Sequence, residues 1–224
     1  MSARLLAVDT TAEFGSIALA EGDHVIEEVI LHSPDGFAHL LFGHIERLLA
    51  RHGWDIRDVD CFAGAAGPGS FTGVRVGLTA VKGLAEATGR PAIAVSNLQA
   101  IASFGSGRLR APVLDARRGE VYGGLYNQDL EAVQPETVSA FSQWLESLPD
   151  APVEFLSPDF SPFRHAIAST RFASAEIRET PRALAGAIAR IAATRLGSGQ
   201  GTDPAAIDAN YVRRSDAELF WKDR

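Results

Sequence analysis

The chain has 224 residues, of which 46% are hydrophobic and 22% are charged, and its formal net charge is −7. This is the composition of a globular protein, because a disordered chain would be poorer in apolar residues and richer in charge. The excess of acidic residues argues against a protein that grips nucleic acid unaided, since phosphate contacts need clustered Lys and Arg. A single cysteine, Cys61, excludes an internal disulfide framework and any multi-cysteine zinc site.

The sequence predicts neither a signal peptide nor a membrane span. Asp9 comes too early for the apolar core of a signal peptide. The longest stretch without Asp, Glu, Lys or Arg covers residues 91–107, where Asn97, Gln99 and serines interrupt it. We therefore expect a cytoplasmic protein that does not interact with a membrane.

The first half of the chain predicts three strands and then helices that alternate with strands. Two β-rich runs around Gly22 indicate a hairpin, and the leucines of residues 37–52 recur at the helical period. In chain order we predict strands at residues 4–9, 15–20 and 25–32, a helix at 37–52, a strand at 59–66, a glycine-rich loop at 67–73, a helix at 74–88, a strand at 91–95 and a short helix at 98–104.

The second half has a similar order. We predict strands at residues 111–116, 120–127 and 132–138, a helix at 141–148, a strand at 153–156, a short helix at 162–169, a strand at 172–177 and a helix at 181–196. Pro181 is expected in the first turn of that last helix. Residues 106–110 form a flexible, polar stretch between the halves. The chain is therefore predicted to have two domains, residues 1–106 and 107–224.

Both halves follow the approximate order β-β-β-α-β-α, which predicts an α/β protein. Three strands in a meander, followed by parallel strands that helices separate, form a mixed sheet with helices packed on it. The actin, sugar-kinase and Hsp70 ATPase fold (the ASKHA fold) has this order in both of its lobes. The analogy predicts a two-lobed fold and nothing about function, because one fold hosts many functions.

The first strand ends in Asp9, Thr10 and Thr11, where the chain turns tightly. Backbone amides and hydroxyls at such a turn can face a phosphate. The alternative is that these side chains satisfy their own backbone. Ser70 and Thr72, in the glycine-rich loop, are also candidates to face a phosphate, or to cap the next helix. The loop is not a P-loop, because no Lys-Ser or Lys-Thr closes it.

The helix after this loop has a face of small residues. Its members recur at spacings of four, three, four and three, and they are Gly73, Gly77, Ala80, Leu84 and Ala87. Such a face permits very close approach of a second helix, which can belong to a partner or to the same domain. The residues alone leave both possibilities open.

A predicted hairpin turn in the second half carries four charges, on Asp115, Arg117, Arg118 and Glu120. It can face an anion or a partner, or it can be a solvated turn. The histidines do not converge at metal-binding spacing, and Cys61 has no adjacent base, so we predict neither a metal site nor a catalytic centre.

Four segments taken together resemble the TsaB family of YeaZ-type proteins. They are LLAVDTT followed by GSIAL, the central GPGSFTGVRVGL, the DARRGEVY hairpin and a late YVR, and they span residues 4 to about 214. The resemblance implies a two-lobed fold and a subunit that helps to make the threonylcarbamoyladenosine modification of tRNA. It also implies that the chain is not an enzyme by itself.

The resemblance further implies that TsaD performs the chemistry, which is transfer of a threonylcarbamoyl group to N6 of adenosine 37 in tRNAs that read codons beginning with A. This chain is then a scaffold or activating partner of TsaD, and TsaE joins the assembly. It has no cofactor of its own, although a nucleotide can sit at the boundary with TsaD. Contact with tRNA comes only through the complex, and without TsaD the same surface can pair two copies of the chain.

By carry-over from the family, two helices of the first lobe are the expected contact surface. The residues assigned to it are Leu41, Ile45 and Leu48 on the first helix and Gly73, Gly77, Ala80, Leu84 and Ala87 on the second. The C-terminal tail, with Phe220 and Trp221, is expected to dock on the first lobe or on a partner. The alternative function is a stand-alone ATP-using enzyme, or a glycopeptidase-like hydrolase, of the same fold.

Overall fold

The computed structural model describes residues 2–212, which form two compact units. The first unit contains the chain up to Asn97 together with Arg182–Asn210, and the second is built on Leu98–Pro181. This division differs from the sequence prediction, which placed everything after residue 106 in one domain. The predicted docking of the C-terminal tail concerns residues outside 2–212. No helix within residues 2–212 has the length and apolar character needed to cross a membrane.

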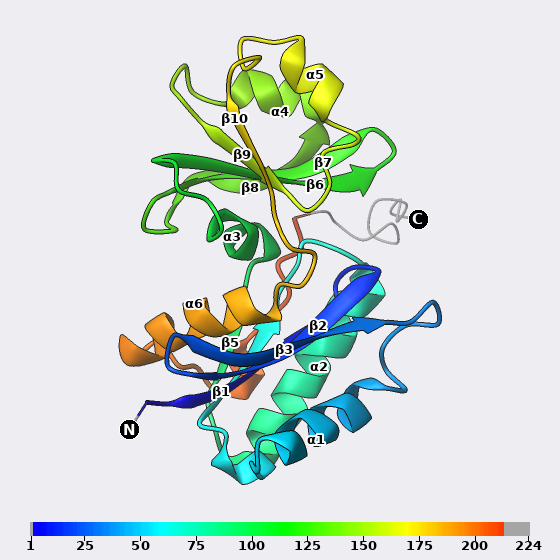
Figure 1. Ribbon diagram of the computed structural model, residues 1–224, viewed down its shortest axis with the longest axis vertical. Coiled ribbons are helices and arrows are strands. Elements are labelled where there is room, and N and C mark those ends of the chain that lie inside the picture. The colour runs from blue at the N-terminus through cyan, green and yellow to red at the C-terminus, as the bar shows by residue number, and fades with distance from the viewer. Residues whose placement is uncertain (1, 213–224) are drawn as a thin grey trace, which may run out of the picture. The chain divides into compact units, whose positions relative to one another are not determined.

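The first unit is built on a mixed five-stranded sheet (Figure 1). Its strands are β1 (Arg4–Asp9), β2 (Phe14–Glu21), β3 (His24–His32), β4 (Cys61–Ala65) and β5 (Ala92–Val95), in the order β3-β2-β1-β4-β5. The strands β1, β2 and β3 are antiparallel, whereas β4 and β5 run parallel to β1. The central strands are almost entirely apolar because helices cover both faces of the sheet.

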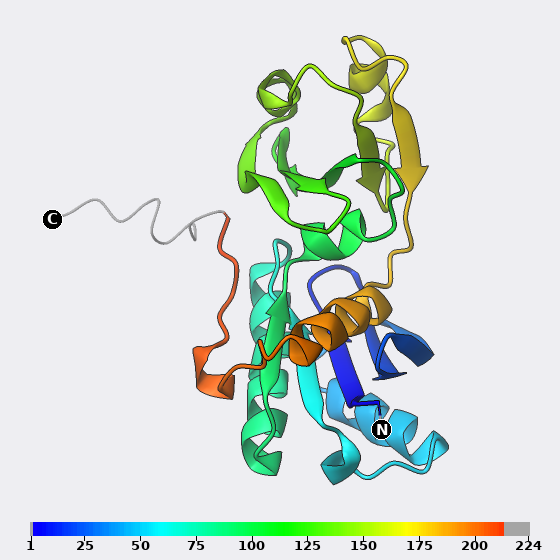
Figure 2. The same ribbon diagram turned by 90° about the vertical axis from the view of Figure 1, so that its left-hand side faces the viewer.

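Two helices, α1 (Leu41–Arg51) and α2 (Phe71–Thr88), lie on one face of this sheet, and α6 (Ala185–Gly197) lies on the other. The view of Figure 2 shows α2 and α6 on opposite sides of the strands. The short 3-10 helices are Ile56–Asp58 and Pro204–Ala206. Because α6 packs on β1, β2 and β4, the segment that begins at Arg182 belongs to the first unit.

The predicted starts of three helices need correction. The carbonyl of Phe37 accepts hydrogen bonds from the amides of Leu40 and Leu41, so a tight turn precedes α1 and the helix begins at Leu41 rather than at residue 37. Ser70 caps α2, which therefore begins at Phe71 rather than at residue 74. The third helix, α6, begins at Ala185, so Pro181 lies before it and not in its first turn.

The second unit repeats the topology of the first. Its strands are β6 (Leu109–Arg117), β7 (Glu120–Asn127), β8 (Ala132–Ala140), β9 (Glu154–Ser157) and β10 (Glu176–Glu179), in the order β10-β9-β6-β7-β8. Its helices are α3 (Asn97–Ala102), α4 (Phe141–Ser147) and α5 (Arg164–Ala168). The predicted duplicated ASKHA-like α/β fold is therefore confirmed, with one further strand and helix closing each half of the chain.

A buried carboxylate fixes the start of the second unit. Glu154, at the first position of β9, accepts hydrogen bonds from the amides of Ser106 and Gly107 at 2.7 and 2.6 Å, and it also pairs with Arg178. Burial acts to raise the pKa of Glu154, but the Arg178 guanidinium and the two amides outweigh it and hold the pKa below its usual range. The polar stretch predicted as a flexible boundary is thus tied to the sheet.

Candidate functional site

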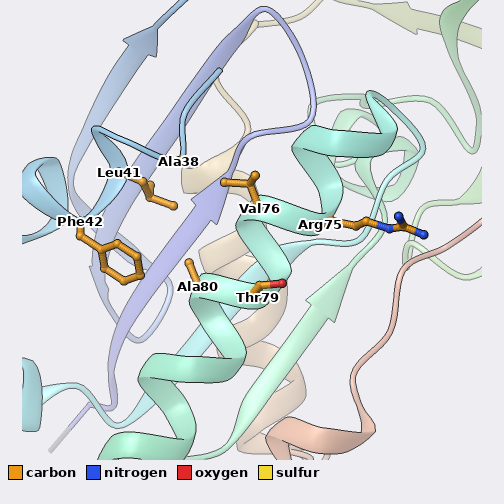
Figure 3. A pocket seen from close by; sticks show the side chains of 7 residues that line it. All are labelled: Ala38, Leu41, Phe42, Arg75, Val76, Thr79 and Ala80. Atoms are coloured by element: carbon orange, nitrogen blue, oxygen red, sulfur yellow. The ribbon is translucent and has the colours of Figure 1, made fainter. Parts of the chain in front are cut away.

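An apolar groove lies between α1 and α2 and encloses about 330 Å³. It is lined by Ala38, Leu41, Phe42, Arg75, Val76, Thr79 and Ala80 (Figure 3). The ring of Phe42 points toward α2 across the groove, and 56% of this residue is exposed to solvent. Ala80 forms part of the floor, where a small side chain leaves the space open. A large exposed aromatic beside an apolar hollow is typical of a protein-binding surface.

The groove exists because α1 has apolar residues on two sides. Ile45 and Leu48 face the sheet and are buried in the core of the first unit. Phe42 lies outside that stripe, since one residue along a helix turns the side chain by about 100°. The sequence prediction assigned Leu41, Ile45 and Leu48 to the partner interface; all three are buried, although Leu41 also lines the groove. The sequence prediction did not include Phe42. Its position outside the apolar stripe, where an aromatic side chain faces solvent, was the signal that could have identified it.

The small-residue face of α2 divides into three parts. Gly73 and Gly77 pack inside the unit, where a Cβ atom would lie 2.0 Å from the Thr10 carbonyl oxygen and 2.6 Å from the Thr10 hydroxyl, respectively. They are therefore unavailable to a partner. Ala80 borders the groove, Leu84 is half-buried against the core, and Ala87 is exposed. Thus only the middle and end of this face can meet a second protein.

The β1–β2 turn brings together three of the predicted phosphate-facing residues and buries them all. Asp9, Thr10 and Thr11 are between 1% and 3% exposed. The Thr10 hydroxyl donates to the carbonyl of Gly73 at 2.7 Å. The amide and the hydroxyl of Thr11 both donate to Asp9 Oδ1, at 2.9 and 2.6 Å. Apart from Asp9 Oδ2, the side-chain oxygens of these residues are therefore hydrogen-bonded within the unit.

Asn97 closes this turn from the carboxyl end of β5, which lies at the same edge of the sheet as the carboxyl end of β1, and sequence reasoning did not identify it. Its side-chain amide donates to the Thr11 hydroxyl at 2.6 Å, and its side-chain oxygen accepts from the amide of Gly67 at 3.0 Å. The amide of Ser70 donates to the carbonyl of Thr11 at 2.7 Å. The glycine-rich loop and the β1–β2 turn are therefore held together by hydrogen bonds on both sides.

The other two phosphate candidates lie on the surface. Ser70 accepts a hydrogen bond from the amide of Gly73 at 3.2 Å and so acts as the helix cap that the sequence allowed. Thr72 is exposed in the first turn of α2. Three of the five candidates are therefore buried and two are exposed, and their phosphate role stays a prediction.

The charged hairpin joins β6 and β7. The side chain of Asp115 accepts a hydrogen bond from the Arg117 amide at 2.8 Å and lies 3.6 Å from the Arg117 guanidinium. Arg117 and Arg118 both have left-handed backbone conformations, with φ of 66° and 57°. Glu120 begins β7. The anion or partner role of this hairpin stays a prediction.

Residues 2–212 contain no group of three or more His, Cys, Asp or Glu side chains that could hold a metal ion. Cys61 is buried in β4, and burial, with a smaller effect from Asp60, raises the pKa of its thiol to about 12. A thiol with such a pKa is protonated at neutral pH and is a poor nucleophile.

Comparison with known proteins places this fold in a defined class. Residues 35–190 match the family model of TsaD, described as tRNA N6-adenosine threonylcarbamoyltransferase. The chain is 33% identical to the tRNA threonylcarbamoyladenosine biosynthesis protein TsaB of Bacillus subtilis, over 97% of both chains. It is 35% identical to the Escherichia coli TsaB protein over 56% of both chains. YeaZ from Pseudomonas aeruginosa superposes with a TM-score of 0.73 at 26% identity, covering 93% of this chain and 99% of that one.

The class is therefore that of threonylcarbamoyltransferase-related proteins with a duplicated α/β fold. Within it, the chain belongs to the TsaB family of YeaZ-type proteins, because a TsaB relative matches it over almost its full length. The resemblance found in the sequence motifs is thus confirmed.

Proposed function

We propose that the chain is a non-catalytic partner subunit in the biosynthesis of threonylcarbamoyladenosine in tRNA. It binds a TsaD-type transferase through the groove between α1 and α2. The transferase then modifies N6 of adenosine 37 in tRNAs that read codons beginning with A. TsaE joins the assembly, tRNA contacts the assembled complex, and a nucleotide is held at the boundary with TsaD. In the absence of TsaD, two copies of the chain pair through the same groove.

The observation that carries this proposal is the exposed Phe42 ring beside a hollow of small and apolar side chains. Burying apolar surface stabilises a complex by about 25 cal/mol for each Å² removed from water. Aromatic anchors that fill a pocket account for most of the binding energy in many interfaces. A partner helix that fills this hollow would cover the Phe42 ring, so the groove suits protein binding better than solvent exposure.

The chain contributes binding energy to this function rather than a chemical step. A partner that binds one conformation of an enzyme better than another shifts the enzyme toward the favoured conformation. The chain would act in this way by holding TsaD in the conformation that is competent for transfer. The buried β1–β2 turn supports a role without nucleotide turnover in the chain itself.

The experiment is a binding titration of TsaD against the Phe42→Ala variant. We expect the affinity to fall at least about tenfold, since loss of a central aromatic anchor costs about 2 kcal/mol or more. The matched control is Ile30→Ala, which also truncates an apolar side chain that is 60% exposed, but on β3 and outside the groove. It should leave the affinity unchanged, and both variants should keep the thermal stability of the wild-type chain.

Equal TsaD affinity in wild type and Phe42→Ala would contradict the groove as the binding site. The alternative function, a stand-alone ATP-using enzyme or a glycopeptidase-like hydrolase, predicts turnover by the isolated chain. Assays of ATP hydrolysis and of glycopeptide cleavage without TsaD therefore separate the two functions. Turnover that tracks the chain through purification would favour the enzyme.

A further inference from the structure

Within residues 2–212, no side chain of opposite charge pairs with the buried carboxyl group of Asp9. Its Oδ1 atom accepts both hydrogen bonds from Thr11, while its Oδ2 atom is buried and has no hydrogen-bond partner among these residues. In the same part of the chain, the charged side chain that acts on it is Glu28 of β3, which has the same sign. Burial of an unpaired carboxylate is costly, and such a group takes up a proton instead.

Four backbone amides at the N-termini of α6 and α2 are already hydrogen-bonded within the first unit. At the N-terminus of α6, the amides of Leu184 and Ala185 donate to the Ser16 hydroxyl at 3.2 and 2.9 Å, and the amide of Gly186 donates to Glu28 at 2.9 Å. At the N-terminus of α2, the amide of Gly73 donates to the Ser70 hydroxyl. A phosphate would have to displace these bonds to reach the amides of Gly73, Leu184, Ala185 or Gly186.

The turn is also closed by packing. A Cβ atom at Gly69 would lie 2.6 Å from the Thr11 carbonyl oxygen, and one at Gly73 would lie 2.0 Å from the Thr10 carbonyl oxygen. The backbone of the glycine-rich loop and of α2 thus rests directly on the turn. A ligand placed between these segments would have to push the backbone of the loop or of α2 away from the turn.

We propose that Asp9 is uncharged in the folded chain, with its proton on Oδ2, and that the β1–β2 turn is a permanently closed turn that takes up neither a divalent cation nor a nucleotide phosphate. Asp9 then acts as a neutral hydrogen-bond acceptor that holds Thr11, and through it Asn97, in place. This role is independent of any partner, so the inference does not rest on the function proposed above.

The proposal predicts a specific dependence of stability on pH. Desolvation by burial raises the pKa of Asp9; hydrogen bonds from Thr11 and the nearby Asn97 amide oppose the rise, and the Glu28 charge adds to it. In the unfolded chain the pKa of Asp is about 3.9. At a pH between the pKa of Asp in the unfolded chain and the raised pKa of Asp9 in the folded chain, the folded chain holds one more proton than the unfolded chain. The contribution of Asp9 to the free energy of unfolding is therefore complete below the unfolded-state pKa. It is lost as the pH rises through the folded-state pKa.

The experiment compares the unfolding equilibrium of the wild type and of Asp9→Asn by urea denaturation from pH 5 to pH 7. Asn has the shape of Asp but cannot ionise. The ratio of the folding equilibrium constant of Asp9→Asn to that of the wild type should therefore rise by up to about tenfold for each pH unit. The matched control is Asp115→Asn. Asp115 also accepts a hydrogen bond from the amide two residues later, but it is exposed. The ratio of the folding equilibrium constant of Asp115→Asn to that of the wild type should therefore change less than about twofold over the same pH range.

Two measurements keep the proposal testable even where Asp9→Asn does not fold. Infrared spectra of the folded wild type at pH 7 should contain the band of a protonated carboxyl group, and this band should vanish on unfolding. Addition of MgCl₂, with or without ATP, should leave the wild-type unfolding midpoint unchanged. The proposal is overturned if the band is absent, if Mg²⁺ stabilises the wild type, or if Asp9→Asn loses stability relative to the wild type as the pH rises.

Discussion

The β1–β2 turn of the first unit and the β6–β7 hairpin of the second occupy the same place in the same topology, yet one is buried and the other is exposed. Asp9 and Asp115 each accept a hydrogen bond from the amide two residues later, at 2.9 and 2.8 Å. The local chemistry is thus alike. What differs is the packing, because Thr10 lies directly against α2, whereas the side chain of Arg117 is 87% exposed. Access to a ligand is therefore decided by the helix above the turn and not by the turn itself.

The largest effect is expected from Gly73→Ala, which breaks the closed turn. The new Cβ would lie 2.0 Å from the Thr10 carbonyl oxygen, and both groups are held by backbone. We expect a loss at the upper end of about 1–3 kcal/mol, or more, in the free energy of unfolding measured in urea. Gly83→Ala on the same helix is the control: nothing lies within 4 Å of its Cβ position, so it should stabilise by about 0.5–1 kcal/mol. Equal stability of Gly73→Ala and wild type would mean that the turn is not tightly packed.

A smaller loss is expected from Asn97→Ala. The variant leaves the buried Gly67 amide without its acceptor and the Thr11 hydroxyl without its donor. One unsatisfied buried group costs about 1–3 kcal/mol, so we expect a loss of about 2 kcal/mol by thermal or urea unfolding. Asn127→Ala in the second unit removes three side-chain bonds, two from the amides of Asp129 and Glu131 and one to the Glu131 carboxylate, at an exposed turn where water can replace them. The free energy of unfolding of Asn127→Ala should fall by less than about 1 kcal/mol. A larger loss in Asn127→Ala than in Asn97→Ala would contradict the contrast between the buried and the exposed turn.

The smallest effect concerns the exposed hairpin and its left-handed Arg117. Arg117→Val and Arg117→Asn both remove the ion pair with Asp115, so their difference reports the backbone alone. Asn tolerates the left-handed conformation and a β-branched residue does not. We expect Arg117→Asn to be more stable than Arg117→Val by about 1–2 kcal/mol. Differential scanning calorimetry of the pair would show equal melting temperatures if the hairpin relaxed out of this conformation.

Much of the fold could be predicted because it depends on local patterns. The alternation and the apolar runs identified the strands, and the strand at residues 120–127 was predicted with its observed bounds. The predicted helix starts were less accurate. The turn at Phe37 and the cap at Ser70 depend on hydrogen bonds that the apolar period does not contain.

The site was harder to predict because its residues meet through tertiary structure. Asn97 contacts Thr11 across 86 positions of sequence, and no local pattern links them. The small-residue face of α2 was identified, but its spacing cannot say that Gly73 and Gly77 pack against β1–β2 while Ala80 borders the groove. The leucines of α1 formed a clear stripe, whereas the exposed aromatic residue of the groove, Phe42, lies beside that stripe.

The return of α6 to the first unit has a consequence for synthesis on the ribosome. Residues up to Asn97 emerge first, but the helix that covers one face of their sheet begins at Ala185. At about 5–20 residues per second, making Leu98–Pro181 takes on the order of ten seconds. During that interval the apolar face of β1, β2 and β4 lacks its cover, whereas Leu98–Pro181 is a continuous stretch of chain. The nascent chain thus presents a ready substrate for chaperones until α6 is made.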